Sequence, residues 1–127
     1  MAGIFGIGHS NVPREKLLER LQAYGINRVV DVRTKPYSRF SPQYNRNAFD
    51  LCLATNNIIY DYRGLNLGGL GENVDYQQTL EEIVALAGSE NVALMCSEKD
   101  YRKCHRYTML APDIELLGKT LEHIAYD

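Results

Sequence analysis

The stretch with the most varied chemistry runs from Leu94 to Arg106. A short apolar segment ends there at Cys96 and Glu98, and the triplet Cys104-His105-Arg106 follows. A thiol, a carboxylate, an imidazole and cationic groups are the side chains that nucleophilic, acid–base and anion-binding chemistry use. We therefore predict that a functional site includes this stretch.

Two interpretations of Cys96 remain open. A free cysteine at the end of a buried strand is usually inert filler. To act as a nucleophile it needs nearby cations or a helix N-terminus to lower its pKa, and Lys99, Arg102 and His105 follow it. The spacing Cys-x5-Arg, from Cys96 to Arg102, is also that of loops that wrap a phosphate. The five residues between them contain none of the glycines that such a tight loop usually needs.

A metal site would use Cys96, Cys104, His105 and His9. Cys104 and His105 are neighbours, and adjacent side chains on a helix point about 100° apart, so both rarely reach one ion. The sequence also has no Cys-x2-Cys pair. A site of Cys96, His9 and one of Cys104 or His105 remains an alternative, but we favour a protein without a metal, and the sequence does not indicate which cofactor, if any, it uses.

Apolar runs with strand and helix periodicity alternate along the chain. The alternation predicts an α/β fold, a three-layer α/β/α sandwich with a mainly parallel, Rossmann-like sheet of about five strands. The length fits a single domain, residues 1–127. Ser10 or Asn11 is expected to cap the first helix, and Pro112 to disturb the last. Strands are expected at 4–7, 28–33, 58–62, 92–95 and 123–125, and helices at 13–24, 47–56, 76–87 and 101–117.

Ligands of parallel sheets bind beyond the carboxyl ends of the strands. The ends of the first, second and fourth expected strands supply polar groups, so we predict one convergent site. Asp31 and Glu98 are the candidate general acid and base, and a structural ion pair is the alternative for each. The candidate catalytic residues are Cys96, Glu98, Asp31 and His105.

The connection from Thr34 to Asn45 is long and carries both cations and aromatic rings. Cations fix phosphates and rings stack bases; the alternative is a lid packed by its own aromatics. Arg102 and Arg106 are four residues apart and would share one face of a helix near its N-terminus, where anions are favoured. The candidate ligand-binding residues are His9, Ser10, Asn11, Arg33, Lys35, Ser38, Arg39, Arg102 and Arg106.

The formal net charge of −2 and the pI of about 5.9 exclude a protein that is basic overall. The charge is nevertheless uneven, because residues 28–46 hold five bases and one acid whereas residues 72–90 hold five acids and no base. Three cysteines, a start unlike a signal peptide and no long apolar run predict a cytoplasmic, soluble protein with reduced thiols and no membrane partner. The segment 67–71 is rich in glycine but lacks the Lys-Ser/Thr of a P-loop.

Six blocks follow one another along the chain: Ile7 to Asn11, Val30 to Arg33 with Pro36 and Ser38, Leu67 to Gly69, Leu94 to Glu98, Cys104 to Arg106, and His123-Ile124. Together they resemble the signature of the family called domain of unknown function 488. The resemblance implies a compact bacterial or archaeal α/β domain and a site that includes Cys96 and the Cys-His-Arg triplet. The family pattern does not rely on an arginine at Arg102. Separately, Asp31-Val32-Arg33 is similar to a fragment of rhodanese-like sulfur transferases.

These patterns together predict an enzyme or enzyme-like domain that binds a phosphate-bearing ligand, a nucleotide or nucleic acid, at the carboxyl edge of the sheet. Two alternatives remain. One is cysteine-centred chemistry, either sulfur transfer or redox. The other is a non-catalytic nucleic-acid-binding module. The sequence leaves the reaction and the oligomeric state open.

Overall fold

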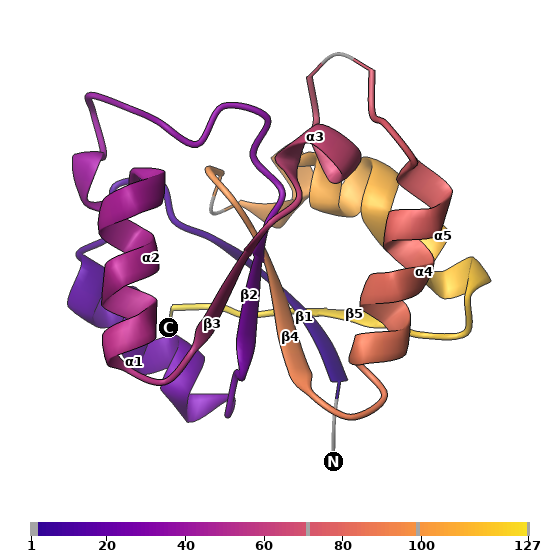
Figure 1. Ribbon diagram of the computed structural model, residues 1–127, viewed down its shortest axis with the longest axis horizontal. Coiled ribbons are helices and arrows are strands. Elements are labelled where there is room, and N and C mark those ends of the chain that lie inside the picture. The colour runs from indigo at the N-terminus through magenta and orange to yellow at the C-terminus, as the bar shows by residue number, and fades with distance from the viewer. Residues whose placement is uncertain (1–2, 71, 99, 127) are drawn as a thin grey trace.

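A single parallel sheet of five strands organises the molecule (Figure 1). The structure, a computed structural model, describes residues 3–70, 72–98 and 100–126, without the side chains of residues 101, 106 and 107. The strand order is β3-β2-β4-β1-β5, and every pairing is parallel. The strands are β1 (Gly3–Gly8), β2 (Arg28–Asp31), β3 (Ile59–Tyr62), β4 (Asn91–Cys96) and β5 (Leu121–His123).

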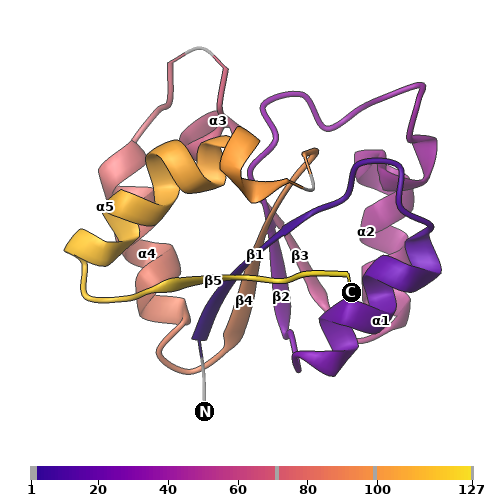
Figure 2. The same cartoon turned by 180° about the vertical axis from the view of Figure 1, so that it is seen from behind.

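Helices cover both faces of this sheet, and the predicted three-layer α/β/α sandwich is confirmed. On one face lie α1 (Arg14–Ala23) and α2 (Arg46–Thr55). On the other lie α3 (Gly64–Leu67), α4 (Tyr76–Leu86) and α5 (Ala111–Leu116). Figure 2, which shows the molecule from behind, gives the same division into two helical layers.

The apolar runs of β2 and β4 follow from burial on both faces. Successive side chains of a strand point to opposite sides. Val29 accordingly packs with α1 and α2, and Val30 packs with α4 and α5. The two central strands therefore need no polar face, and their polar residues are displaced to the strand ends.

The prediction of a helix over residues 101–117 that Pro112 disturbs is wrong for its first half. The chain instead forms a 3₁₀ turn (Tyr101–Lys103), a π-helical segment (Arg106–Leu110) and then α5. Pro112 lies in the first turn of α5, where its missing N–H is tolerated. The same residue removes the helical hydrogen bond that the carbonyl of Thr108 would accept, and the wider π geometry precedes it.

Smaller differences occur at the element ends. Neither Ser10 nor Asn11 caps α1; its N-cap position is Pro13, with no side-chain cap. The last strand begins two residues before the predicted one, because Leu121–His123 pairs with Ile4–Gly6. The sequence also did not predict the single turn of α3 or the 3₁₀ turn Pro42–Tyr44. None of the helices in the described ranges has the length and apolar character needed to cross a membrane.

Candidate functional site

The ends of β1, β2 and β4 lie side by side at the carboxyl edge of the sheet. Gly8 pairs with Cys96 and Asp31 with Met95. The ladder continues past the strands, since the backbone N–H of His9 donates to Cys96 O at 3.0 Å and that of Ser10 to Ser97 O at 2.7 Å. Three blocks that are far apart in the sequence are thus held together by backbone hydrogen bonds.

Asp31, fully buried at the end of β2, is the centre of a polar network. Its Oδ1 accepts from the backbone N–H of Arg33 at 3.0 Å and from Nε of Arg33 at 2.8 Å. Its Oδ2 accepts from Nη2 of Arg33 at 2.7 Å and from the hydroxyl of Tyr60 at 2.6 Å. Four donors surround this carboxylate, and burial together with the Asp31 hydrogen bond raises the pKa of Tyr60, which therefore stays a donor.

His9 extends the same network towards β1. Its Nε2 accepts from Nη1 of Arg33 at 3.2 Å, since a guanidinium only donates. Nδ1 therefore carries the proton and donates to Ser10 O at 2.7 Å. Burial and then the neighbouring Arg33 charge lower the pKa of His9 to about 4, only partly offset by the Ser10 bond and by Asp31. The ring stacks on that of Tyr44 at 4.5 Å, so His9 is a fixed, neutral acceptor.

Arg33 is clamped on one side and available on the other. Of the five N–H groups of a guanidinium, the described residues use three, two bound by Asp31 and one by His9. The buried guanidinium also lines two cavities at this edge. Asp31 and His9 thus orient Arg33 while leaving two N–H groups for another partner.

The first cavity has a volume of about 310 Å³. Its lining joins the end of β4, the segment after β2, a glycine-rich loop and the turn before the π-helical segment. Besides Arg33, two exposed lysines, Lys35 and Lys103, contribute positive charge. No described lining residue is a carboxylate. The lining consists of Arg33, Thr34, Lys35, Gly69, Leu70, Cys96, Ser97, Lys103, Cys104 and His105.

A second cavity of about 260 Å³ shares Arg33, Lys35 and Ser97 with the first. The shared residues form the border between the two spaces. Its remaining lining is rich in hydroxyl groups and again includes no described carboxylate: His9, Ser10, Tyr37, Ser38 and Ser41.

Cys96 and Cys104 are joined as a disulfide in the wall of the first cavity. The structure pairs these two sulfurs in place of the reduced thiols that the sequence predicted, whereas Cys52 on α2 is free. The turn before the π-helical segment returns Cys104 to the end of β4, beside Cys96. His105 Nδ1 lies 3.7 Å from Cys104 Sγ, and Nε2 donates to Leu67 O at 3.0 Å.

The loop Gly68-Gly69 closes the first cavity by close backbone approach. A Cβ on Gly69 would lie 2.9 Å from Nδ1 of His105, and one on Gly68 would overlap Thr34 and the carbonyl of Gly64. Only glycine lets the loop lie this near. Asn73 holds the loop by bonding both the N–H and the carbonyl of Gly68.

Some predicted site residues lie outside both cavities. Asp31 lines neither cavity and forms a buried salt bridge with Arg33. Glu98 instead accepts from the backbone N–H of Asp100 at 3.0 Å. Arg102 is highly exposed and pairs with Asp100 at 3.2 Å. Asn11 and Arg39 are exposed and line neither space.

Arg106 falls in the π-helical segment, and its side chain lies outside the described part of the chain. The remaining candidates do line a cavity: Cys96 and His105 the first, His9, Ser10 and Ser38 the second, and Arg33 and Lys35 both.

Sequence reasoning missed Lys103 in particular. A regular helix from residue 101 favoured the face of Arg102 and Arg106, but the 3₁₀ turn brings Lys103 to the cavity. The other cavity residues outside the predicted set are Thr34, Tyr37, Ser41, Gly69, Leu70, Ser97 and Cys104. The resemblance to a known signature had indicated Ser97, Gly69 and Cys104, whereas no pattern in the sequence separates Thr34 or Leu70 from ordinary loop residues.

Among the residues that the structure describes, no group of three or more His, Cys, Asp or Glu side chains is arranged to hold a metal ion.

The family model described as Domain of unknown function DUF488 matches residues 13–73 and 69–111, well over half of the chain. His9 to Asn11 and β5 lie outside the matched residues. Comparisons with curated proteins and with solved structures give no match.

Proposed function

The chain belongs to the family Domain of unknown function DUF488, and from the geometry of its carboxyl edge we propose that it binds a phosphate-bearing ligand in the first cavity. The observation that carries the proposal is the charge of the lining. Arg33, Lys35 and Lys103 surround a space of about 310 Å³ that no described carboxylate lines. A phosphate group would be the counter-charge for this lining.

Arg33 supplies the directional part of the proposed site. Its guanidinium is already oriented by Asp31 and His9, so little side-chain entropy is lost when an anion binds. The buried salt bridge also balances part of its charge. Most of the net attraction therefore comes from Lys35 and Lys103, neither of which lies within 4.0 Å of a carboxylate in the described chain.

The proposal is tested by thermal stabilisation at low salt with inorganic phosphate, pyrophosphate and nucleoside mono-, di- and triphosphates. We expect at least one compound to stabilise the protein and Lys35→Ala and Lys103→Ala each to weaken the effect. Lys119→Ala is the matched control, because Lys119 precedes β5 at the opposite edge of the sheet. Absence of stabilisation by any phosphate compound contradicts the proposal.

A second candidate function is cysteine-centred redox chemistry, favoured by the Cys96–Cys104 disulfide in the cavity wall. In that reaction two molecules of a small thiol are oxidised to their disulfide, and each cysteine sulfur gains one hydrogen. Alkylation followed by mass measurement tests it, with Cys52 as the internal reference. We expect one alkylated cysteine after incubation with glutathione disulfide and three after reduction; three in both conditions would exclude this candidate.

A further inference from the structure

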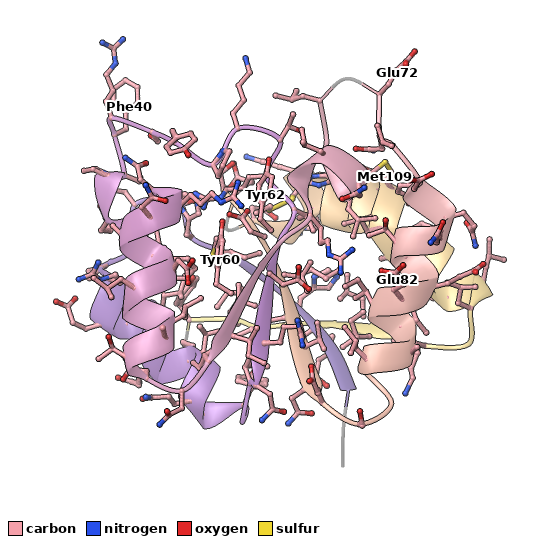
Figure 3. The ribbon with its side chains drawn as sticks, viewed as in Figure 1. Phe40, Tyr60, Tyr62, Glu72, Glu82 and Met109 are labelled. Atoms are coloured by element: carbon pink, nitrogen blue, oxygen red, sulfur yellow. A yellow bond between two sulfur atoms is a disulfide. The ribbon has the colours of Figure 1, made fainter. Side chains whose placement is uncertain are left out.

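Two aromatic side chains in the loop beside the cavities are largely exposed to solvent. Tyr37 is 62% exposed and Phe40 is 79% exposed, whereas Tyr44 on the following turn is fully buried. Figure 3 shows Phe40 at the outer margin of the molecule, directed away from it. A lid packed by its own aromatics would bury these rings, so the lid alternative accounts for Tyr44 but not for Tyr37 or Phe40.

The loop that carries the two rings is held in place by its own hydrogen bonds. Ser38 Oγ accepts from the backbone N–H of Phe40 at 3.0 Å and of Ser41 at 3.3 Å. Asn45 Oδ1 accepts from the N–H of Ser38 at 2.7 Å, and Ser41 Oγ donates to Ser10 O at 2.9 Å. These hydrogen bonds hold the backbone of the loop in one conformation. Little conformational entropy of the loop backbone is therefore lost when a partner binds the exposed rings.

Cations accompany these rings. The guanidinium of Arg39 lies over the ring of Phe40 at 5.6 Å, and Lys35 borders both cavities. Tyr37 is itself part of the lining of the second cavity. Flat apolar surfaces and positive charge therefore alternate from Phe40 to the first cavity, without an acidic side chain in the segment 34–45.

We propose that the ligand of this edge is single-stranded nucleic acid, whose backbone phosphate occupies the first cavity and whose adjoining bases stack on Tyr37 and Phe40. This inference rests on the proposed phosphate-binding function. A single strand offers both a phosphate at each residue and an unpaired base face, which is the pair of features that this surface complements. In a duplex the base faces are stacked inside, and an acidic peptide offers charge without rings.

The experiment measures anisotropy of fluorescein-labelled oligothymidylate and oligouridylate of about 12 nucleotides at low salt. Competitors are a duplex of the same length and polyglutamate of matched charge. The variants are Tyr37→Ala, Phe40→Ala and their combination. Leu116→Ala is the control, since Leu116 on α5 is 84% exposed and remote in the fold from the loop.

We expect each aromatic variant to weaken binding of one or both oligonucleotides about tenfold, Leu116→Ala to leave it unchanged, and both competitors to displace the strand poorly. The response to inorganic phosphate should be the same in Tyr37→Ala and Phe40→Ala as in the natural chain. The inference is overturned if the double aromatic variant binds the oligonucleotides as tightly as the natural chain does. It is also overturned if polyglutamate or the duplex binds as tightly as the single strand. In either case, a retained response to inorganic phosphate leaves the proposed function standing. If no phosphate compound stabilises the natural chain, both the proposed function and this inference are overturned.

Discussion

Strand β2 has an arginine at each end, and the two are held in different ways. Arg28 begins the strand and binds two carboxylates, Asp61 at 3.0 Å and Glu90 at 2.8 Å. Arg33 follows the strand and binds one, the fully buried Asp31. Arg63 adds a second cation to the first group and pairs with Asp61 and Glu82. Among the described residues, the ion group around Arg28 therefore contains two arginines and three carboxylates, and the group around Arg33 contains one of each.

The difference separates a structural ion cluster from a binding surface. Arg28 and Arg63 are balanced by partners that are partly exposed to solvent, and neither lines either cavity at the carboxyl edge. Arg33 is buried, forms its one printed ion pair with Asp31 and lines both cavities. The same residue type on one strand thus ends either with its bonding capacity filled or with part of it directed at an open space.

Asp31→Asn tests this comparison most strongly. It leaves the buried Arg33 without a counter-charge, and breaking such a buried pair costs about 3–5 kcal/mol of unfolding free energy. Urea unfolding of the variant measures the loss. Asp61→Asn is the counterpart in the group around Arg28, where each arginine keeps a second carboxylate, and we expect a loss of about 1 kcal/mol. Equal losses in the two variants would mean that the two ion groups do not differ in kind.

Tyr60→Phe removes the hydroxyl that donates to Asp31 Oδ2 at 2.6 Å; Figure 3 labels Tyr60 and its neighbour on the strand, Tyr62. Removing a hydrogen bond to a buried charged group is expected to cost about 1.5–3 kcal/mol. Tyr62→Phe is the matched control, because its hydroxyl lies on the same strand but donates to the neutral carbonyl of Thr34 at 2.9 Å. A net loss of about 1 kcal/mol is expected there. If the control loses as much as Tyr60→Phe, the Asp31 carboxylate gains nothing special from this donor.

Because His9 is buried, the free energy of unfolding depends on pH. Burial lowers the pKa of His9 to about 4 from 6.5. The His9 imidazole is therefore protonated below about pH 6.5 in the unfolded chain but only below about pH 4 in the folded protein. The contribution of His9 to the free energy of unfolding is fully present above pH 6.5 and is lost as the pH falls from 6.5 to about 4. The loss between pH 7 and pH 5 is about 2 kcal/mol. Urea unfolding at both values should show that His9→Gln reduces this fall, and an unchanged fall would contradict the assignment.

The sequence predicts the sandwich because strand and helix periods alternate and the central strands are uniformly apolar. Val29-Val30 and Val92 to Met95 have no polar face, which only a sheet covered on both sides explains. The broken helix after residue 100 was not predictable from periodicity, because Pro112 indicates where a helix starts or breaks but not which carbonyls adopt π geometry before it.

Which residues line the site was predictable only in part. The strand-end rule identifies Arg33, Cys96 and His9, since their places follow from the order of a parallel sheet. It does not distinguish Asp31, which faces inward to Arg33 and Tyr60, from a carboxylate that meets a ligand. Lys103 depends on the turn that replaces a helix. These distinctions are tertiary, and spacing in the sequence does not contain them.

Glu90→Gln is the smallest test of the comparison. Glu90 accepts from Nε of Arg28, and this bond is the main cause that raises the pKa of Arg28. The two side chains are 25% and 18% exposed, so solvent weakens their attraction, and Arg28 keeps Asp61. We expect a loss below about 1 kcal/mol that shrinks further with added salt. A salt-independent loss as large as that of Asp31→Asn would show that the start of β2 is also a buried, uncompensated charge site, and the contrast between its two ends would disappear.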